Sequence, residues 1–416
     1  NLSQKILNDS SVKPAGKRQN LLFFGLLAIP ACFAPLSIDL LVPSLPAIAS
    51  SLTANLSDTQ LTIYTFILAY GLAPFFWGAL SDKYGRKPLL LLGMALYMLI
   101  TIACAFAQNI ESLAALRFGQ GFAAASGIVI ARAMLRDRYG ASGTTKAIAT
   151  LYMFLAVLPV LIPIAGGYLA AFLSWQDLFF IMFAVAALAL AGVAFFIRET
   201  MIKDRPTGNK ESDAKKTLGS SVAVSTVLRH RLFLQSALTN MFAMSATVLF
   251  VTNYSFLATE FFAASAKENG YMLAYFNLTL AAGIYVVRVI VPFWGVDSSM
   301  RAAVGALLLG WLITAILCAS SLPAIAALMP ALLLASFGHG IIMALSPGQA
   351  LIPFSVGAGT ASAIYGCIQS VGASVLSYGV ALLVAKNLAN VSQAILLCAV
   401  LSALCFWFLM AKKPAI

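Results

Sequence analysis

The segment TQLTIYTFILAYGLAPFFWGALSDKYGRKPLLLLGMALYMLITIACAFA, residues 59–107, decides the fold of this chain. Two long apolar runs lie on either side of a charged stretch, SDKYGRK, at residues 81–87. A helix needs about 20 apolar residues to cross the ~30 Å hydrocarbon core of a bilayer, and each run has about that length. The segment therefore predicts two membrane-spanning helices joined by a short, positively charged loop.

The composition of the whole chain agrees with this prediction. Of its 416 residues, 61% are hydrophobic and 10% are charged, whereas soluble domains carry about 25% charged residues. A membrane β-barrel would show segments of about ten residues that alternate in polarity, but the apolar runs here are nearly continuous. We therefore expect an all-α polytopic membrane protein. The net charge of +12 does not predict a nucleic-acid partner, because Lys and Arg lie in short clusters between the apolar runs.

The hydropathy pattern predicts twelve transmembrane helices. The tenth contains Pro330 and Pro347 and is the least regular by sequence, although proline is tolerated in spanning helices. The predicted spans are 21–48, 59–80, 89–107, 113–135, 145–172, 176–197, 232–257, 269–291, 302–320, 324–348, 360–384 and 391–411.

The loop charges predict the orientation. Of the 26 Lys and Arg residues, all except Arg117, Lys267 and Lys386 fall on one side of the predicted membrane. Cytoplasmic loops carry an excess of Lys and Arg, so both termini are expected in the cytoplasm.

A single long polar segment divides the chain into two six-helix halves. It is rich in charged residues and contains Pro206 and Gly208, which is typical of a flexible linker. The predicted parts are a cytoplasmic tail at 1–20, a first bundle at 21–198, a cytoplasmic linker at 199–231, a second bundle at 232–411 and a tail at 412–416.

A short repeat suggests that the two halves are related. The string Phe-Trp-Gly occurs at 76–78, at the end of the second span, and at 293–295, at the end of the eighth. An Asp and an Arg follow each copy. Transporters are often built from internal repeats, so we interpret the two strings as equivalent positions of a duplicated chain.

The loop GALSDKYGRKP, which begins at Gly78, resembles the signature loop of the major facilitator superfamily. Gly85 is expected to permit a left-handed turn between two closely packed helices. Asp82 can face a helix N-terminus, and Arg86 can pair with a carboxylate at the end of the fourth helix, for which Asp137 is the candidate. The resemblance implies a major facilitator fold in which this loop acts as a conformational latch.

Three further strings resemble motifs of twelve-helix drug–proton antiporters. LRFGQGFAAASG, at 116–127, is similar to a motif whose buried arginine serves proton coupling, which implies that role for Arg117. LPVLIPIAGG, at 158–167, is a partial match to the antiporter motif of the fifth helix. IDLLVPSLPAIA, at 38–49, resembles the first helix of the Bcr/CflA (bicyclomycin and chloramphenicol resistance) branch. The matching positions of the fifth-helix motif are Pro159, Pro163, Gly166 and Gly167.

Asp39 and Arg117 are charged residues whose positions within the spans are not explained by membrane topology. Asp39 is the only carboxylate well inside a predicted span, and ionisable residues in a bilayer are by default functional. At 1.5 Å per residue, Asp39 lies about 27 Å from the cytoplasmic start of its helix and Arg117 about 6 Å from the opposite face, so both fall in the outer half. We therefore predict that they pair and that a proton competes for Asp39. The alternative is an ion pair that serves only helix packing.

Several polar residues within spans could line a substrate cavity, although bonding between helices explains them equally well. His339 could titrate, or it could be a satisfied core histidine. The six cysteines lack metal-ligand spacing, so no metal and no cofactor are expected. The candidate cavity residues are Tyr64, Tyr152, Asn240, Asn253, Tyr275, Asn277, His339, Tyr365 and Gln369.

These features predict a proton-coupled secondary transporter that exports small amphipathic compounds such as antibiotics. No sequence motif of an enzyme is present. An exporter of siderophores or metabolites, a proton-coupled importer on the same scaffold and a non-transporting receptor remain alternatives. The expected partners are protons, the amphipathic substrate and the lipid bilayer. The resemblance implies a monomer in the bacterial inner membrane.

Overall fold

The computed structural model describes residues 17–201, 224–319, 325–354, 358–383 and 387–409. Most of the predicted N-terminal tail, most of the predicted linker and the tail at 412–416 lie outside these residues. The described residues form helices and no strand. The fold is therefore all-α, as predicted from the composition.

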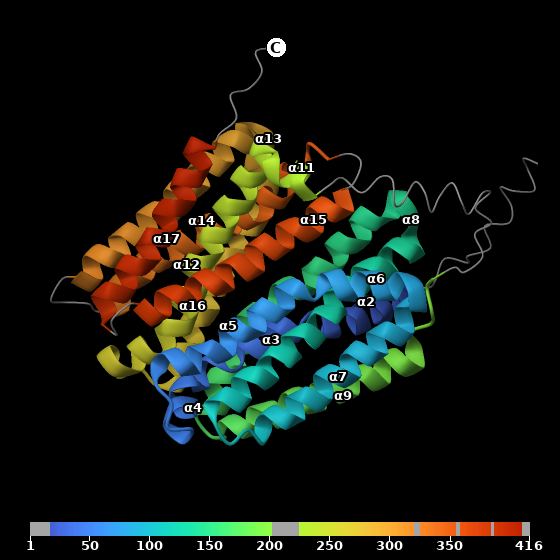
Figure 1. Cartoon of the computed structure of the whole chain (residues 1–416), viewed down its shortest axis with the longest axis horizontal. Helices are drawn as coiled ribbons and strands as arrows, with labels where there is room; N and C mark the ends of the chain where they lie inside the picture. Colours follow the sequence, from blue (N-terminus) through green and yellow to red (C-terminus); the bar gives the residue numbers. More distant parts are fainter. Residues whose placement is uncertain (1–16, 202–223, 320–324, 355–357, 384–386, 410–416) are drawn as a thin grey trace, which may run out of the picture.

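The helices of the first half run from α2 to α9, drawn in blue to green in Figure 1. They are α2 (Lys17–Ala31), α3 (Phe33–Asp39), the 3₁₀ turn η1 (Val42–Ser44), α4 (Leu45–Ser51), α5 (Leu56–Leu72), α6 (Pro74–Tyr84), α7 (Arg86–Ala105), α8 (Ile110–Ala170) and α9 (Trp175–Phe196).

The helices of the second half, drawn in yellow to red, pack beside the first half (Figure 1). They are α11 (Val224–Arg229), α12 (Arg231–Phe262), α13 (Ala266–Ala319), α14 (Ile325–Leu351), α15 (Ala358–Cys367), the π-helical turn η2 (Ile368–Gly372), α16 (Ala373–Leu383) and α17 (Leu388–Phe408).

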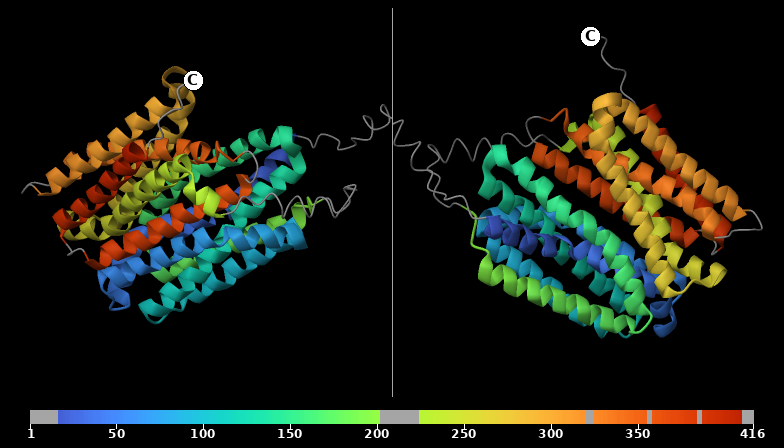
Figure 2. Two further views of the ribbon diagram at one scale, coloured as in Figure 1. Left: turned by 45° about the horizontal axis from the view of Figure 1, so that its top comes forward. Right: turned by 180° about the vertical axis from the view of Figure 1, so that it is seen from behind.

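Within the described residues, ten helices are long and apolar enough to cross a membrane, or eleven if the bent pair α5 and α6 forms one span. This count treats α13 as one helix, although its 54 residues would measure about 81 Å if straight. Gly283 and Gly310 lie on different arms of α13, yet both pack against the stretch 335–341 of α14. Helix α13 therefore folds back on itself, which argues for the twelfth span (Figure 2).

The first span is broken where prolines remove backbone donors. Helix α3 ends at Asp39, and the chain continues through η1 into α4. Proline has no N–H, so Pro43 cannot donate to the carbonyl of Asp39, four residues earlier. The amide of Leu41 bonds to the carbonyl of Ile38 instead of that of Ser37. The carbonyl groups at the end of α3 are thereby left free for other partners.

The expectation that the tenth span is the least regular was wrong. Helix α14 runs without interruption from Ile325 to Leu351 and includes both prolines. The irregular spans are the first, described above, and the eleventh, in which α15 and α16 are joined by the π-helical turn η2.

Three glycines with positive φ allow the chain to reverse between consecutive spans. They are Gly85 (φ 102°), between α6 and α7, Gly140 (φ 64°), within α8, and Gly295 (φ 75°), within α13. Residues with a Cβ rarely adopt this conformation. The predicted turn at Gly85 is therefore confirmed.

The interpretation of the two Phe-Trp-Gly strings as equivalent positions was wrong. Trp77 lies inside α6, is 3% exposed and donates to the carbonyl of Phe122 at 2.7 Å. Trp294 is 61% exposed and lies directly before the turn at Gly295. Gly78 is helical, so Gly295 corresponds in conformation to Gly85. The strings match in letters, but they stand at different distances from their turns.

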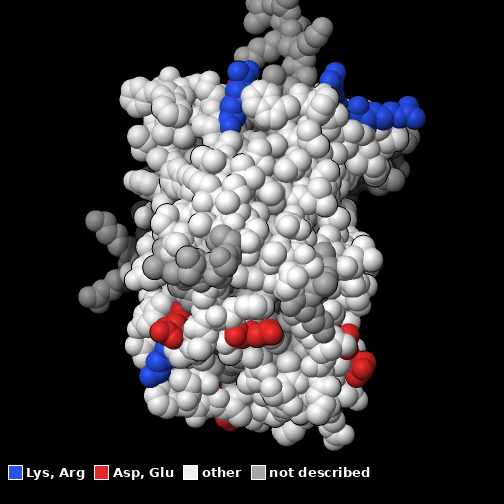
Figure 3. All heavy atoms as spheres, turned by 90° about the vertical axis from the view of Figure 1, so that its left-hand side faces the viewer, with Lys and Arg blue, Asp and Glu red and all other residues white. Residues whose placement is uncertain are grey.

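Charged residues gather at the two ends of the bundle. Figure 3 shows most Lys and Arg toward the upper end of the face that it draws, and Asp and Glu toward the lower end, with a smaller basic area beside them. We call the end that carries the turns at Gly85, Gly140 and Gly295 the basic end. The acidic end is opposite and carries Asp58, Glu111, Asp177, Glu260 and Glu268 at helix starts and ends. Between the ends, apolar side chains as exposed as Leu188 (76%) and Leu99 (57%) face outward, which suits contact with lipid.

The buried apolar residues form one large cluster in each half, and polar contacts join the halves near the acidic end. Tyr64 and Gln60 of α5 bond to the hydroxyl and carbonyl oxygens of Thr252 at 2.9 and 3.3 Å. The Tyr168 and Tyr271 hydroxyls bond at 2.5 Å. Ser57 of α5 donates to the carbonyl of Ala381 of α16 at 3.3 Å. The halves are thus joined at the acidic end and through the middle.

Candidate functional site

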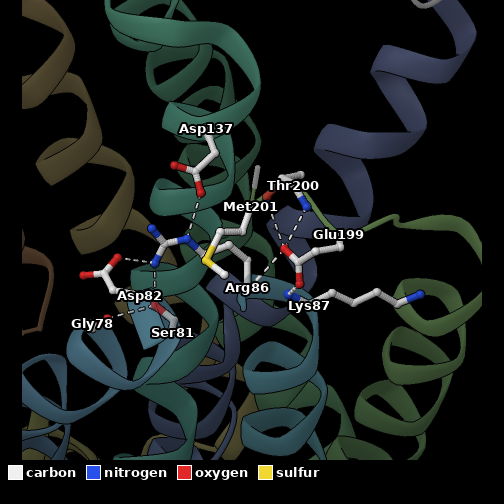
Figure 4. Close-up of polar contacts among 9 residues, drawn as sticks. All are labelled: Gly78, Ser81, Asp82, Arg86, Lys87, Asp137, Glu199, Thr200 and Met201. Atoms are coloured by element: carbon white, nitrogen blue, oxygen red, sulfur yellow. Dashed lines mark hydrogen bonds and ion pairs between the residues drawn. The ribbon is translucent and has the colours of Figure 1, made fainter. Parts of the chain in front are cut away.

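Arg86 is the centre of a polar cluster at the basic end of the first half (Figure 4). Its guanidinium lies 2.8 Å from the carboxylate of Asp137 on α8 and 2.6 Å from that of Asp82 on α6. It also donates to the hydroxyl of Ser81 at 2.8 Å. The contact predicted between Arg86 and Asp137 is present, and it ties the end of α6 and the start of α7 to the part of α8 just before the turn at Gly140.

Glu199, which follows α9, is a member of this cluster that the sequence analysis missed. Its carboxylate accepts hydrogen bonds from the backbone N–H groups of Arg86 and Lys87 at 3.1 and 3.0 Å (Figure 4). The group that faces the N-terminus of α7 is therefore Glu199, whereas Asp82 was expected there. A carboxylate is stabilised at a helix N-terminus because free N–H groups point toward it. A Glu just after a span, close to a basic loop, was the signal that could have found it.

The environment of Glu199 favours its ionised form. Partial burial opposes ionisation, but the backbone N–H groups of Met201, Lys87, Arg86 and Thr200 donate to the carboxylate and hold the pKa of Glu199 below its ordinary value of 4.5. A Cβ on Gly85 would lie 2.8 Å from Oε2 of Glu199. Glycine at this position thus leaves room for the carboxylate as well as permitting the turn.

Glu199→Gln is expected to destabilise the protein at neutral pH by about 1 kcal/mol, the usual value of a helix N-terminal cap. Because the pKa of Glu199 is lower in the folded state than in the unfolded state, its contribution is full above pH 4.5 and is lost as the pH falls through the folded-state value. Thermal unfolding in detergent at about pH 7 and about pH 3.5 should show a smaller difference from wild type at the lower pH. Glu111→Gln, at an exposed helix start, is the matched control. An equal difference at both pH values would contradict the assignment.

Arg117 of α8 is completely buried in the first half. It donates to the carbonyls of Ser37 and Thr62 at 3.0 and 3.3 Å and to the side chain of Gln120 at 2.5 Å. Its guanidinium also lies over the ring of Phe66, 4.5 Å from the centroid. Arg117 thus satisfies the Ser37 carbonyl, which has no helical partner because the first span breaks at this point.

The polar neighbours of Arg117 were not predicted from the sequence. Gln120 donates to the hydroxyl of Thr101 at 2.7 Å, and Tyr97 bonds to the hydroxyl of Ser37 at 2.7 Å. These side chains join α3, α7 and α8 in one buried network. Gln120 lies three residues after Arg117, on the same helix face, and this spacing was the available signal.

The predicted ion pair between Asp39 and Arg117 is absent from this structure. Among the described residues, Asp39 forms no salt bridge, and its carboxylate accepts a long hydrogen bond, 3.4 Å, from Asn277 of α13. Arg117 bonds to the carbonyl of Ser37, two residues before Asp39. The two charges lie apart because Arg117 is saturated by carbonyl and amide oxygens, while Asp39 faces the second half.

The glycines of the fifth-helix motif lie where helices pack closely. A Cβ on Gly166 would lie 2.7 Å from the carbonyl oxygen of Leu40, in the broken first span. One on Gly167 would lie 2.5 Å from that of Ala266, at the start of α13. Pro163 leaves the carbonyl of Pro159 without a helical donor, and Asn277 donates to it at 2.7 Å. The motif therefore brings α8 against α3 and α13.

The candidate cavity residues do not gather around one site. Tyr64 and Asn277 lie between the halves, whereas Asn240 and Tyr365 bond to each other at 2.8 Å inside the second half. The other five candidates are also separated from one another. His339 bonds to Thr247 at 2.8 Å, and Asn253 bonds to the carbonyl of Leu249. Tyr152 bonds to Arg132, Tyr275 is exposed, and Gln369 lies in η2.

Two cavities lie outside the surroundings of Asp39 and Arg117. The larger, about 520 Å³, is inside the second half and has an apolar lining that includes Phe250 and Trp311. The smaller, about 330 Å³, lies between the halves near Gln60. Asn253 contributes to both. Among the described residues, no group of three or more His, Cys, Asp or Glu could hold a metal ion.

Solved structures share this fold. The xylose transporter XylE from E. coli, in a partially occluded inward-open conformation, superposes with a TM-score of 0.74 at 11% identity, over 95% of this chain and 99% of that one. A bacterial homologue of the human lysosomal transporter Spinster, in an inward-facing conformation, gives 0.70 at 14% identity, over 95% and 97%. At such low identity these similarities show the fold alone.

The sequence comparisons identify the family. The model described as Major Facilitator Superfamily matches residues 27–377. The multidrug resistance protein MdtL of Escherichia coli is 28% identical over 91% of this chain and 93% of its own length. A bicyclomycin resistance protein homologue of Haemophilus influenzae is 33% identical over 45% of this chain and 47% of its own length. The chain therefore belongs to the major facilitator superfamily of membrane transporters, and it is similar to members named for bicyclomycin and multidrug resistance.

Proposed function

We propose that this transporter exports small amphipathic compounds, such as antibiotics, in exchange for protons by alternating access. The observation that carries the proposal is the place of Asp39. Its carboxylate lies within the bundle, where the first and second halves meet, and no cation pairs with it among the described residues. A carboxylate without a cation inside a membrane protein is suited to binding and releasing a proton.

Arg117 has a supporting role in this proposal. Its side chain, on α8, bonds to the carbonyl of Thr62 on α5 and to that of Ser37, which lies two residues before Asp39. These bonds hold the broken first span against α5 and α8. The guanidinium thereby positions the carboxylate without neutralising it. Direct competition between Arg117 and a proton for Asp39 would require another conformation than the present one.

We place the basic end in the cytoplasm of a bacterial cell, because Lys and Arg are enriched on the cytoplasmic side of inner-membrane proteins. Hydrogen bonds join the halves toward the acidic end, and this supports our proposal that the described conformation opens inward. In this orientation the cluster of Gly78, Asp82, Gly85, Arg86 and Asp137 is a latch on the cytoplasmic face. We propose that the protein works as a monomer, since each chain supplies both halves.

The substrate is expected to be a neutral, zwitterionic or anionic amphipath. The acidic residues Glu260, Glu268 and Asp297 of the described second half lie at helix ends or turns. A pocket for multiply cationic drugs would need carboxylates deeper in the spans. The names of the two resistance-protein relatives favour an antibiotic over a siderophore or a metabolite.

Substrate-driven proton movement in inside-out membrane vesicles tests the proposal. Vesicles with an acidic interior should release protons when an exported compound is added outside, because an exchanger carries the compound in and protons out. The panel should contain amphenicols, bicyclomycin-like antibiotics and siderophores. Release with an antibiotic supports the proposal, and release with a siderophore alone would favour the alternative substrate class. Proton movement in the same direction as the substrate would identify an importer and overturn export.

A further inference from the structure

We propose that Asn277 is a positioning residue that locks the empty, unprotonated transporter, because its amide links the Asp39 carboxylate to the Pro159 carbonyl across the two halves. This inference rests on the proposed proton coupling and adds a residue to it. Asn277 lies on α13 of the second half, whereas both of its partners belong to the first half.

The first partner of Asn277 is created by the sequence of the fifth span. In a regular helix the amide of residue 163 would donate to the carbonyl of residue 159, but Pro163 has no N–H. The amide of Asn277 donates to this carbonyl at 2.7 Å. The bond does not depend on any ionisable group. It therefore anchors the Asn277 side chain to α8 at any pH.

The second partner depends on protonation. The same Nδ2 atom of Asn277 lies 3.4 Å from Oδ2 of Asp39, and an amide nitrogen carries two hydrogens, so both bonds can exist together. A hydrogen bond to a carboxylate is about twice as strong as one to a neutral acceptor. The bridge between the halves is therefore stronger when Asp39 is ionised and weaker when it is protonated.

In the part of the chain that the structure describes, no other ionisable side chain near this point forms an ion pair or hydrogen bond with Asp39. Arg117 of α8 and Tyr97 of α7 bond to Ser37, on the side of α3 toward the first half. Tyr275 of α13, two residues before Asn277, is 53% exposed. Asn277 is thus the side chain through which the second half contacts the Asp39 carboxylate.

An exchanger must not switch conformation when it carries neither substrate nor proton, since this would dissipate the gradient. The bond between ionised Asp39 and Asn277 meets this requirement. It keeps the acidic end closed until a proton binds Asp39 or a substrate breaks the bond. Nearby packing supports such a lock: Gly167 and Gly270 bring α8 and α13 into direct backbone contact two turns from Asn277. Only a ligand that reaches Asp39 would then release the halves.

Distance measurements between the halves test this inference. Spin labels are attached through p-acetylphenylalanine at Ser51 on α4 and Leu382 on α16, which are exposed and leave the six native cysteines in place. Without substrate, the wild-type open fraction at the acidic end should rise about threefold between about pH 8 and about pH 5.5, as the charge-assisted bond is lost. Asn277→Leu should show the larger open fraction at both pH values. Asn277→Asp, which preserves size but replaces the donor, should also lose the wild-type response.

The controls separate this inference from the proposed function. Thr279→Val, two residues away with hydroxyl bonds only within its own helix, should respond like wild type. Asp39→Asn should give the larger open fraction at both pH values, and adding Asn277→Leu to it should change nothing further. If both Asn277 variants keep the full pH response and Asp39→Asn loses it, the role of Asn277 is refuted, but the proposed proton coupling through Asp39 is not. A full response in Asp39→Asn, or none in wild type, would overturn the proton coupling and the lock with it.

Discussion

Asp39→Asn is expected to reduce substrate-driven proton release to below about one hundredth of the wild-type rate, the range in which loss of a positioned proton-transfer group falls. Asparagine has the same size as aspartate, and its Oδ1 can still accept a hydrogen bond from Asn277. The bundle should therefore fold and bind substrate, but the side chain can no longer gain or lose a proton. The measurement is proton release in inside-out vesicles, together with substrate binding to the purified variant.

The matched control for Asp39 is Asp58→Asn. Asp58 lies in the first turn of α5 at the acidic end, and its carboxylate is bonded by Asn55, three residues earlier. The Asp58→Asn substitution removes one negative charge, as Asp39→Asn does, but it leaves the contact between Asp39 and Asn277 unchanged. Full proton-driven export by Asp39→Asn would refute the mechanism, and equal losses in the two variants would point to a general effect of charge.

Arg117→Met is expected to give a transporter that does not remain folded when extracted in detergent. Methionine fills a similar volume, but the carbonyls of Ser37 and Thr62 would lose their donor in a dry interior. Each buried acceptor left without a partner costs about 1–3 kcal/mol, and the two together are large compared with the usual stability of a protein domain. The measurements are the monodisperse fraction on size exclusion and the midpoint of thermal unfolding.

Arg117→Lys separates charge from geometry at this position. Lysine keeps the positive charge but carries a compact ammonium group, which cannot reproduce the planar fork that serves three acceptors and lies over Phe66. We expect it to restore only part of the stability. Arg136→Met, on the exposed part of the same helix, should leave the unfolding midpoint unchanged. Arg117→Met with wild-type stability would show that the carbonyl contacts contribute little.

The motifs of the loop predicted its geometry well, because they act over short distances. Gly85 needs a positive φ to join two helices, and Arg86 finds Asp137 because helix ends meet at the basic end. Glu199 was missed because it follows α9, more than 100 residues after Arg86 in the chain. Its position just after a span makes Glu199 a candidate, but only the packing of α9 on α7 shows that it lies over the N-terminus of α7.

The repeat of Phe-Trp-Gly shows the limit of matching letters. Trp77 is buried because it stands about two turns before Gly85, whereas Trp294 directly precedes the turn at Gly295 and is exposed. The environment of a side chain depends on its distance from the turn, which the three letters do not contain. Pro330 and Pro347 were misleading for a related reason, since neighbouring helices allow a spanning helix to continue through proline.

By itself, the sequence determined that this protein is a bundle of membrane-spanning helices with most of its Lys and Arg on one side, because hydropathy and loop charge depend on local composition. It also singled out Asp39 and Arg117, since charges within apolar runs are visible without a structure. Only the tertiary structure decided which groups those charges meet. Arg117 bonds to a carbonyl that a broken helix exposes, and Asp39 meets an asparagine 238 residues further along the chain. Both partners depend on where prolines interrupt helices and how the two halves pack, and these are properties of the folded chain.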